Sequence, residues 1–228
     1  LFPTTENPPR DRLYRNDLVI KPDGSRELRF TDVTETSGIE ATGYGMGVTV
    51  GDIDNDGYDD LYVTNYGPNQ LWRNNGDGTF SDVSDEAGAP YDFLPSEAAA
   101  WADYDNDGFV DLYVAYYETP NGWVEGQLSV GTRDVLYRNN GDGTFTDVSD
   151  KTGIANIPGS GMGVGVADFT GNGVPDIYVG NDARPNHMLV RQDDGSWEDM
   201  ANAMLCDVNM EGMEQSSMGI TIEDFDLD

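Results

Sequence analysis

The chain is poor in the residue types that build many common functional sites. Its 228 residues contain one Cys, one His and 12 Lys plus Arg, against 43 Asp plus Glu, so the formal net charge is −31. One Cys excludes an internal disulfide framework and a Cys-based zinc cluster, and one His excludes a multi-His metal centre. So few basic residues argue against a nucleic-acid-binding surface and against docking on anionic membranes. We therefore expect no nucleic acid among its partners.

Long apolar runs are missing as well. No stretch of 18 or more apolar residues occurs, so we expect no membrane insertion. No signal peptide is visible, and the chain begins with Leu1 rather than Met. Because it also stops inside an acidic motif, we expect a processed or excised segment of a longer polypeptide.

The acidic excess has two competing explanations. The acids could form a solvated, disordered tract, or they could be ligands whose charge is cancelled by bound cations. They do not form long blocks, and aromatic residues make up 11% of the chain, which is too many for a disordered acidic tail. The distribution favours ligands.

Two segments alternate along the chain, and their repetition predicts the fold. The first, of the type LYRNNGDGTFTDVS, occurs at 71–84 and 136–149, with weaker copies at 13–34 and 189–200. Its leading leucines are predicted to be Leu13, Leu71, Leu136 and Leu189. The second is an acidic motif, D-x-D-x-D-G-x-x-D, at 52–60 and 103–111, with a variant at 168–176 and a copy that begins at Asp224.

Each segment predicts a β-hairpin, because short runs of strand-forming residues flank a turn rich in Gly, Asn and Asp. Two hairpins per unit give four antiparallel strands, the content of a β-propeller blade. We expect an all-β fold of about three to four blades, with a sandwich as the alternative. The predicted divisions are an N-terminal linker at 1–12 and a partial propeller at 13–228, with units at 13–46, 47–97, 98–162, 163–217 and 218–228.

The chain is too short to form a complete seven-bladed propeller. Seven blades at this period would need roughly 350 to 450 residues. We therefore expect this chain to be part of a larger propeller, which is expected to have seven blades, or to form a ring that another chain completes.

The acidic motif predicts calcium sites. When such a loop curls, its odd positions supply oxygen ligands, and the Gly at position six takes the positive φ that the turn needs. An EF-hand would place an acid at position twelve, but here that position holds Val63, Val114 or Val179. The predicted ligands, with position seven acting through its backbone carbonyl, are Asp52, Asp54, Asp56, Tyr58 and Asp60; Asp103, Asp105, Asp107, Phe109 and Asp111; and Asp168, Thr170, Asn172, Val174 and Asp176.

The sites are not predicted to be equal. Thr170 and Asn172 replace acids in the third loop, so we expect weaker binding there than in the first two. A fourth site begins with Asp224, Asp226 and Asp228 and is incomplete. The cofactor expected is thus Ca²⁺, at two strong sites, one weaker site and one incomplete site. The alternative is a solvated acidic turn without metal.

These motifs resemble the FG-GAP/VCBS repeat family of calcium-loop β-propellers. The glycine-rich strand entry recurs as GMGV at 45–48 and at 161–164, and as SMGI at 217–220. LYRNNGDGTFTDVS, the stretch from Asn181 to Asn186, and NMEG at 209–212 are most similar to the cartilage-acidic-protein-like (ASPIC/UnbV-associated) branch. The resemblance implies an extracellular, secreted or cell-surface protein used in adhesion or other interactions.

Three functions remain open at this stage. The first is a calcium-stabilised propeller that binds a protein or a glycan, or assembles with copies of itself, and the long insertion at 116–133 would suit a partner. The second is a propeller-scaffold enzyme such as a polysaccharide lyase, and the third is a subunit of a surface filament. No set of catalytic residues stands out, and His187 is expected in a surface loop, so we predict no enzyme. A cluster of Met from Met200 to Met218 is expected to make gap-filling contacts, with a partner surface as the alternative.

Overall fold

The computed structural model describes residues 11–88, 95–117 and 132–222. Most of its strands form three four-stranded antiparallel sheets, and within each sheet the strands lie in the order in which they occur along the chain. The first blade contains β5 (Gly45–Gly51), β6 (Asp60–Asn65), β7 (Gln70–Asn74) and β8 (Phe80–Asp82). The second contains β9 (Ser96–Ala102), β10 (Asp111–Tyr116), β12 (Val135–Asn139) and β13 (Phe145–Asp147). The third contains β15 (Gly161–Ala167), β16 (Asp176–Asn181), β17 (His187–Arg191) and β18 (Trp197–Asp199).

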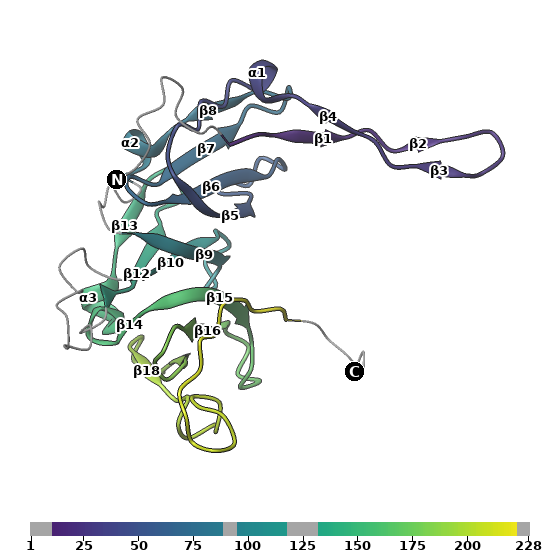
Figure 1. Ribbon diagram of the computed structural model, residues 1–228. Coiled ribbons are helices and arrows are strands. Elements are labelled where there is room, and N and C mark those ends of the chain that lie inside the picture. Colours follow the sequence, from purple (N-terminus) through teal and green to yellow (C-terminus); the bar gives the residue numbers. More distant parts are fainter. Residues whose placement is uncertain (1–10, 89–94, 118–131, 223–228) are drawn as a thin grey trace, which may run out of the picture.

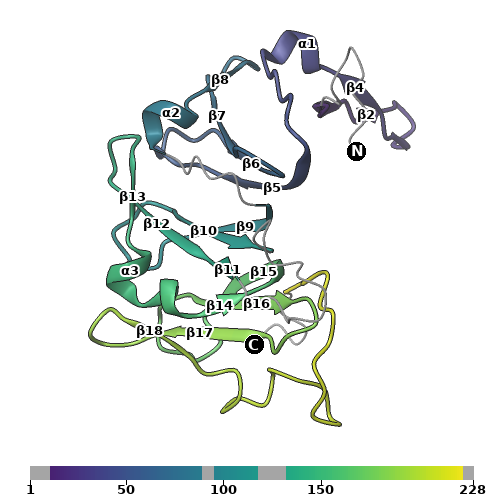
Figure 2. The same cartoon turned by 60° about the vertical axis from the view of Figure 1, so that its left-hand side comes forward.

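The three blades lie side by side in the order of the sequence (Figures 1 and 2). Their first strands are neighbours, because β9 contacts β5 on one side and β15 on the other. This arrangement confirms the predicted all-β fold of propeller blades. The first strands begin at Gly45, Ser96 and Gly161, two residues before the predicted unit boundaries at 47, 98 and 163.

Smaller elements lie at the ends and edges of the blades. An N-terminal hairpin, which extends away from the blades in Figure 1, contains β1 (Tyr14–Asn16), β2 (Val19–Ile20), β3 (Arg26–Glu27) and β4 (Phe30–Asp32). One-turn helices follow the outer strands as α1 (Thr34–Ser37), α2 (Ser84–Ala87) and α3 (Ser149–Thr152), and a 3₁₀ turn, η1 (Ile154–Asn156), comes next. β11 (Thr132–Arg133) pairs with β14 (Pro158–Gly159). Among the described residues, no helix is long and apolar enough to cross a membrane.

The hydrophobic core lies between blades. Successive side chains of a strand point to opposite faces, so the strands of the second blade serve two interfaces. Leu112, Val114 and Tyr116 of β10 pack with residues of the first blade. Tyr113 and Ala115 of the same strand pack with the third blade. This is why the middle strands read as continuous apolar runs instead of an alternation of apolar and polar residues.

The recurrent D-V-S/T motif fastens the outer strand to its neighbour. The Ser84 hydroxyl accepts a hydrogen bond from the backbone N–H of Leu71 at 2.8 Å and donates to Asp82. Ser149 does the same for the N–H of Leu136 at 2.9 Å in the second blade. Thr34 does so for Leu13 in the N-terminal hairpin, at 2.9 Å, so this hairpin repeats the outer half of a blade.

The polypeptide after the third blade continues the repeat. Ile220 and Ile222 lie against β15, close enough that a Cβ on Gly165 would approach the Ile222 side chain at 2.6 Å. Residues leading to 222 therefore occupy the place of a first strand of the next unit. The predicted linker at 1–12 falls outside the described residues except for positions 11 and 12.

Candidate metal centre

Each acidic motif connects the first and second strands of one blade. The loops run from β5 to β6, from β9 to β10 and from β15 to β16, and the residues that close them pair as Gly51 with Asp60, Ala102 with Asp111 and Ala167 with Asp176. All three loops therefore leave the sheet at the same end of their blades. The predicted two-strand frame around each loop is confirmed.

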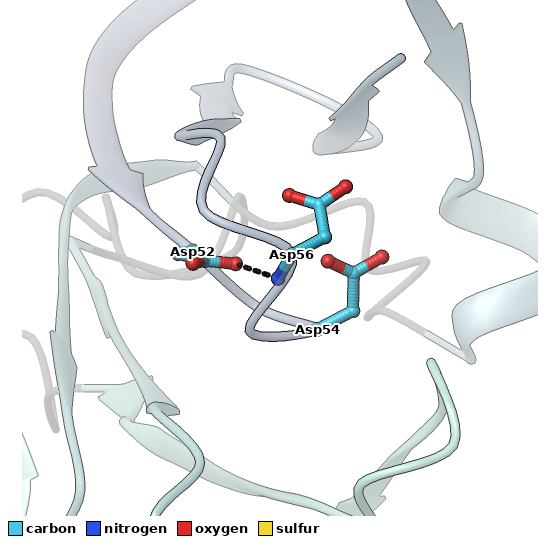
Figure 3. Close-up of side chains that lie close together, drawn as sticks. All are labelled: Asp52, Asp54 and Asp56. Carbon is cyan, nitrogen blue, oxygen red and sulfur yellow. Dashed lines mark hydrogen bonds between the residues drawn. The ribbon is translucent and has the colours of Figure 1, made fainter. Parts of the chain in front are cut away.

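The first Asp of each loop accepts two backbone N–H groups and so makes the chain curl around its carboxylate. Asp52 accepts from Asp56 at 3.1 Å (Figure 3) and from Gly57 at 2.9 Å. Asp103 accepts from Asp107 and Gly108 at 3.0 and 2.9 Å. In the third loop, the Asp168 carboxylate accepts from Asn172 and Gly173 at 3.0 and 2.8 Å, and the hydrogen bond from Gly173 contributes most to its lowered pKa.

Positive φ angles at positions four and six allow the tight curl. Position six is Gly57, Gly108 or Gly173, with φ of 88°, 95° and 84°. Position four is Asn55 or Asn106, each with φ of 58°, and it is Gly171 with φ of 69° in the third loop. Gly adopts this region freely and Asn tolerates it better than most residues.

Carboxylate oxygens converge in the first two loops. One oxygen each from Asp52, Asp54 and Asp56 lies within 4.8 Å of the others. Figure 3 shows the side chains of Asp54 and Asp56 beside each other and pointing the same way, while the Asp52 carboxylate faces the backbone N–H of Asp56. Asp103, Asp105 and Asp111 form the corresponding group in the second loop. Ligands that surround one Ca²⁺ at about 2.3–2.6 Å lie up to about 5 Å apart, so both groups fit this ion.

The predicted closing acid at position nine is buried, and the backbone holds it. Asp60 accepts from the N–H of Ile53 at 2.9 Å and from that of Asn74 at 2.7 Å. Asp111 accepts from Tyr104 at 3.1 Å and from Asn139 at 2.8 Å. The structure brings Asp111 into the convergent group of its loop, whereas the group in the first loop is formed without Asp60.

Burial makes the ionised form of these carboxylates costly. It raises the pKa of Asp111 to about 7, although hydrogen bonds from Asn139 and Tyr104 act in the opposite direction. Burial also raises the pKa values of Asp60 and Asp105, and the charges of neighbouring loop carboxylates add to the effect. A cation bound among them would offset both causes.

Some oxygens of the loops are buried without a hydrogen-bond partner among the described residues. These are Asp54 Oδ1 in the first loop, Asp105 Oδ1 in the second and Asp176 Oδ1 in the third. The Asp176 side chain is fully buried, and its other oxygen accepts from the N–H of Thr170 at 3.0 Å. A buried oxygen without a partner costs about 1–3 kcal/mol, and a metal ion would remove this cost.

The third loop offers fewer charges. No convergent group of three acids is found there in the part of the chain that the structure describes, because Thr170 and Asn172 occupy positions three and five. Asn172 Oδ1 accepts from the N–H of Val174 at 2.8 Å, as Asp56 and Asp107 do for position seven of their own loops. The ligand roles of all these residues stay predictions, and Asp224, Asp226 and Asp228 lie outside the described residues.

The side chain at position seven connects the two repeated motifs. A Cβ on Gly76, in the N-G-D-G turn, would lie 2.7 Å from the Tyr58 ring. The corresponding distance from Gly141 to the Phe109 ring is 2.9 Å. The aromatic ring of the acidic loop thus covers the glycine of the neighbouring hairpin turn, which explains why the two motifs recur together. The carbonyl groups of Tyr58, Phe109 and Val174 remain predicted ligands.

Three expectations need correction. The leucine predicted to lead the third blade is one residue off: the N–H of Met200 donates to Met188 as that of Val83 donates to Leu71, so Met188 occupies the leading position and Leu189 follows it.

The surface-loop position predicted for His187 is also wrong, and the gap-filling role predicted for the methionines holds for Met200 but not for the exposed members of the cluster. His187 lies at the start of β17 with its side chain 12% exposed, and its Nδ1 is 2.6 Å from Asp199 Oδ2. Met210 and Met213 are fully or largely exposed, because the described residues after β18 form no strand that could cover them.

Sequence analysis did not find the polar contacts at the opposite end of the blades. The residue that precedes each third strand accepts the last N–H of the second strand and contacts a Tyr of that second strand. Asn69 does so for Asn65 and Tyr62, and Asn186 for Asn181 and Tyr178. The recurring Pro-Asn at 68–69 and 185–186 is the signal that could have predicted them.

The fold and its loops define a partial β-propeller built from acidic-loop repeats. The sequence matches the family described as FG-GAP-like repeat at residues 6–63, 52–114 and 126–179, and the chain belongs to this family. The matched ranges include the first three acidic loops.

Curated relatives carry the name cartilage acidic protein 1. The human protein is 35% identical over 95 residues, which cover 41% of this chain and 14% of that protein. The Xenopus tropicalis protein is 36% identical over 78 residues, or 34% of this chain and 12% of that protein. The chain thus spans about a seventh of the length of these relatives, whose name is not that of an enzyme.

One solved structure concerns recognition of non-reducing terminal N-acetylglucosamine by an Agrocybe aegerita lectin. It is 19% identical, with a TM-score of 0.42, over 82% of this chain and 44% of the lectin chain. This likeness is too low to bear on either the fold or the ligand.

Proposed function

We propose that the chain is a calcium-stabilised, propeller-like interaction module of an extracellular or cell-surface protein. The observation that carries the proposal is the convergence of Asp103, Asp105 and Asp111, with Asp105 Oδ1 buried and unpartnered among the described residues. Three carboxylates lie close together, and one of their oxygens is buried, so their negative charges disfavour the metal-free fold. A hard divalent ion, which takes six to eight oxygen ligands, would neutralise these charges and coordinate the buried oxygen.

Calcium acts structurally in this proposal. The loops join the first two strands of their blades, so an ion would hold each inner hairpin together. Binding to the folded state alone stabilises that state by mass action, by about 2.7 kcal/mol at 100 times Kd. Loop sites of moderate affinity are filled at the millimolar calcium of extracellular fluid, which supports the proposed location. The name of the curated relatives, cartilage acidic protein 1, also supports the proposed extracellular location.

The partner is proposed to be a protein or a glycan, or further blades of the same repeat. An exposed apolar face of the first blade supports the last option. Val48 and Val50 of β5 are 64% and 52% exposed, whereas their equivalents in the third blade, Val164 and Val166, pack against the core between blades. Measurement of the mass in solution distinguishes a monomer from assembly with copies.

The test of the metal is direct. The protein is dialysed against calcium-containing buffer, its bound metal is quantified, and its melting temperature is measured before and after EDTA. We expect about two tightly bound ions per chain and a lower melting temperature in EDTA. Protein that carries no calcium, or whose melting temperature EDTA leaves unchanged, would reject the proposal.

A further inference from the structure

Adjacent acidic loops are joined by a side chain that no ligand role explains. Asn55 Nδ2 in the first loop donates to the backbone carbonyl of Gly108 in the second loop, at 2.9 Å. Asn106 Nδ2 in the second loop donates to the carbonyl of Gly173 in the third, at 3.4 Å. In both cases position four of one loop contacts position six of the next, so the contact repeats from blade to blade.

The contact joins the two backbone segments that hold the ligands. Asn55 lies between Asp54 and Asp56, both in the convergent group of the first loop. The N–H of Gly108 donates to Asp103 Oδ2 at 2.9 Å, so the residue that accepts from Asn55 also holds the first carboxylate of the second loop. The hydrogen bond therefore depends on the conformation of both loops.

The backbone alone does not require Asn at position four. In the third loop, Gly171 occupies this position and adopts the same positive φ. What Asn55 and Asn106 add to this conformation is the amide donor, and in both loops the donor reaches a carbonyl of the next blade. The amide therefore has a role that the turn itself does not explain.

We propose that Asn55 couples calcium binding at the first and second loops, and that Asn106 couples the second and third loops more weakly. This inference rests on the proposed function. An ion in the second loop orders Gly108, which favours the Asn55 contact and so the calcium-binding form of the first loop; by linkage the reverse holds equally. In the described part of the chain, the buried oxygens Asp54 Oδ1, Asp105 Oδ1 and Asp176 Oδ1 have no hydrogen-bond partner, and this independently supports a cation in all three loops.

The expected coupling is modest. One hydrogen bond of this kind contributes about 0.5–1.5 kcal/mol net, which corresponds to about a two- to tenfold change in affinity. Mutual repulsion of the two ions acts in the opposite direction, and Asn55→Gly leaves it unchanged because this substitution alters no charge. The shorter contact, at Asn55, should therefore give the larger coupling.

Each loop has its own reporter. The amides of Gly57 and Gly108 donate to the first carboxylates of their loops, so their NMR signals should follow calcium binding loop by loop during titration with CaCl₂. Asn55→Gly removes the amide donor and keeps the left-handed conformation. Asp105→Asn weakens the second site without removing a hydrogen bond of its Oδ1.

We expect Asn55→Gly to raise the Kd of the first loop about two- to tenfold, and Asp105→Asn to raise the same Kd by a similar factor. In the Asn55→Gly background, Asp105→Asn should no longer raise the Kd of the first loop. Asn106→Gly should leave the coupling between the first two loops intact. Ala183→Gly, at a distant position with φ of 51°, controls for a new glycine in a left-handed position.

The outcomes separate the two ideas. If the signals of Gly57 and Gly108 do not respond to calcium in the unaltered chain, both the proposed function and the coupling are wrong. If they respond, but Asn55→Gly changes neither the affinity of the first loop nor its dependence on Asp105, the coupling is overturned while the proposed function stands.

Discussion

At the residue scale, Asp134 shows how one substitution changes the energetics of a repeated contact. It occupies in the second blade the place of Asn69 and Asn186 in the other two. Its carboxylate accepts the N–H of Tyr116 at 2.9 Å and the hydroxyl of Tyr113 at 2.6 Å. Burial raises the pKa of Asp134 to about 6, even though these hydrogen bonds lower it. The Asn of the other blades satisfies the same groups without a charge.

Asp134→Asn is predicted to stabilise the protein at neutral pH. A folded-state pKa above the unfolded value means that the folded state holds the proton more tightly, so stability falls as pH rises from about 4 to about 6. The variant lacks this loss and should be about 1–3 kcal/mol more stable at pH 7.5, with no advantage near pH 4. Urea denaturation in excess calcium at both pH values measures the difference.

The matched control places a carboxylate at the same position of the first blade. Asn69→Asp should destabilise the protein at pH 7.5 and recover as the pH is lowered. If Asp134→Asn is less stable than the unaltered protein at pH 7.5, the account of this site is wrong.

Gly51 is a second position at which one residue decides the packing. A Cβ there would lie 2.8 Å from Trp101 Cδ1, and this ring packs against the core between the first and second blades. Gly51→Val should therefore destabilise the protein by about 1–3 kcal/mol, because the ring cannot move away without disturbing that core. Thermal unfolding measures the change in stability. Gly219→Ala, which places no described atom within 4 Å of the new Cβ, should be close to neutral.

At the scale of the element, the acidic loop was predictable because its chemistry is local. A carboxylate at position one can reach the N–H groups four and five residues later whatever surrounds the loop, so the curl at Asp52 and Asp103 follows from sequence. The contacts that hold Asp60 and Asp111 involve Asn74 and Asn139 of the next hairpin and depend on the sheet.

The register of the third blade was mispredicted by one residue because Met188 and Leu189 are both apolar.

Asp105→Asn is predicted to change the sign of its effect with calcium. Without metal it removes a carboxylate whose pKa is raised first by burial and then by the charges of neighbouring carboxylates, so the melting temperature should rise. With calcium at about 100 times Kd it forfeits most of one site, a loss of about 2–3 kcal/mol. Differential scanning calorimetry with EDTA or CaCl₂ checks both signs.

The control for this prediction is Asp59→Asn, which removes an exposed acid at position eight with no predicted ligand role. It should shift the melting temperature little in either buffer. A decrease for Asp105→Asn in EDTA as well would show that Asp105 supports the fold without metal.

At the scale of the whole molecule, the net charge of −31 dominates. A compact body with this charge is destabilised by its own repulsion, and bound divalent ions cancel part of it. Salt screens the same repulsion, since the Debye length falls from about 30 Å at 0.01 M to about 10 Å at 0.1 M.

We therefore predict that KCl raises the melting temperature more in EDTA than in CaCl₂. Between 10 mM and 500 mM KCl, the gain in EDTA should exceed the gain in calcium, because fewer uncompensated charges remain once the loops are filled. Equal gains in the two buffers would show that the loops contribute little to the repulsion.

The sequence by itself determined the blade content, the alternation of the two motifs and the position of each acidic loop, because periodicity, turn residues and carboxylate spacing act over a few neighbouring residues. Only the tertiary structure decided which residues meet across blades: the contact of Asn55 with Gly108, the packing of Trp101 on Gly51, and the burial that shifts the pKa values of Asp111 and Asp134. These depend on how one sheet is placed on the next, and no local pattern encodes that placement.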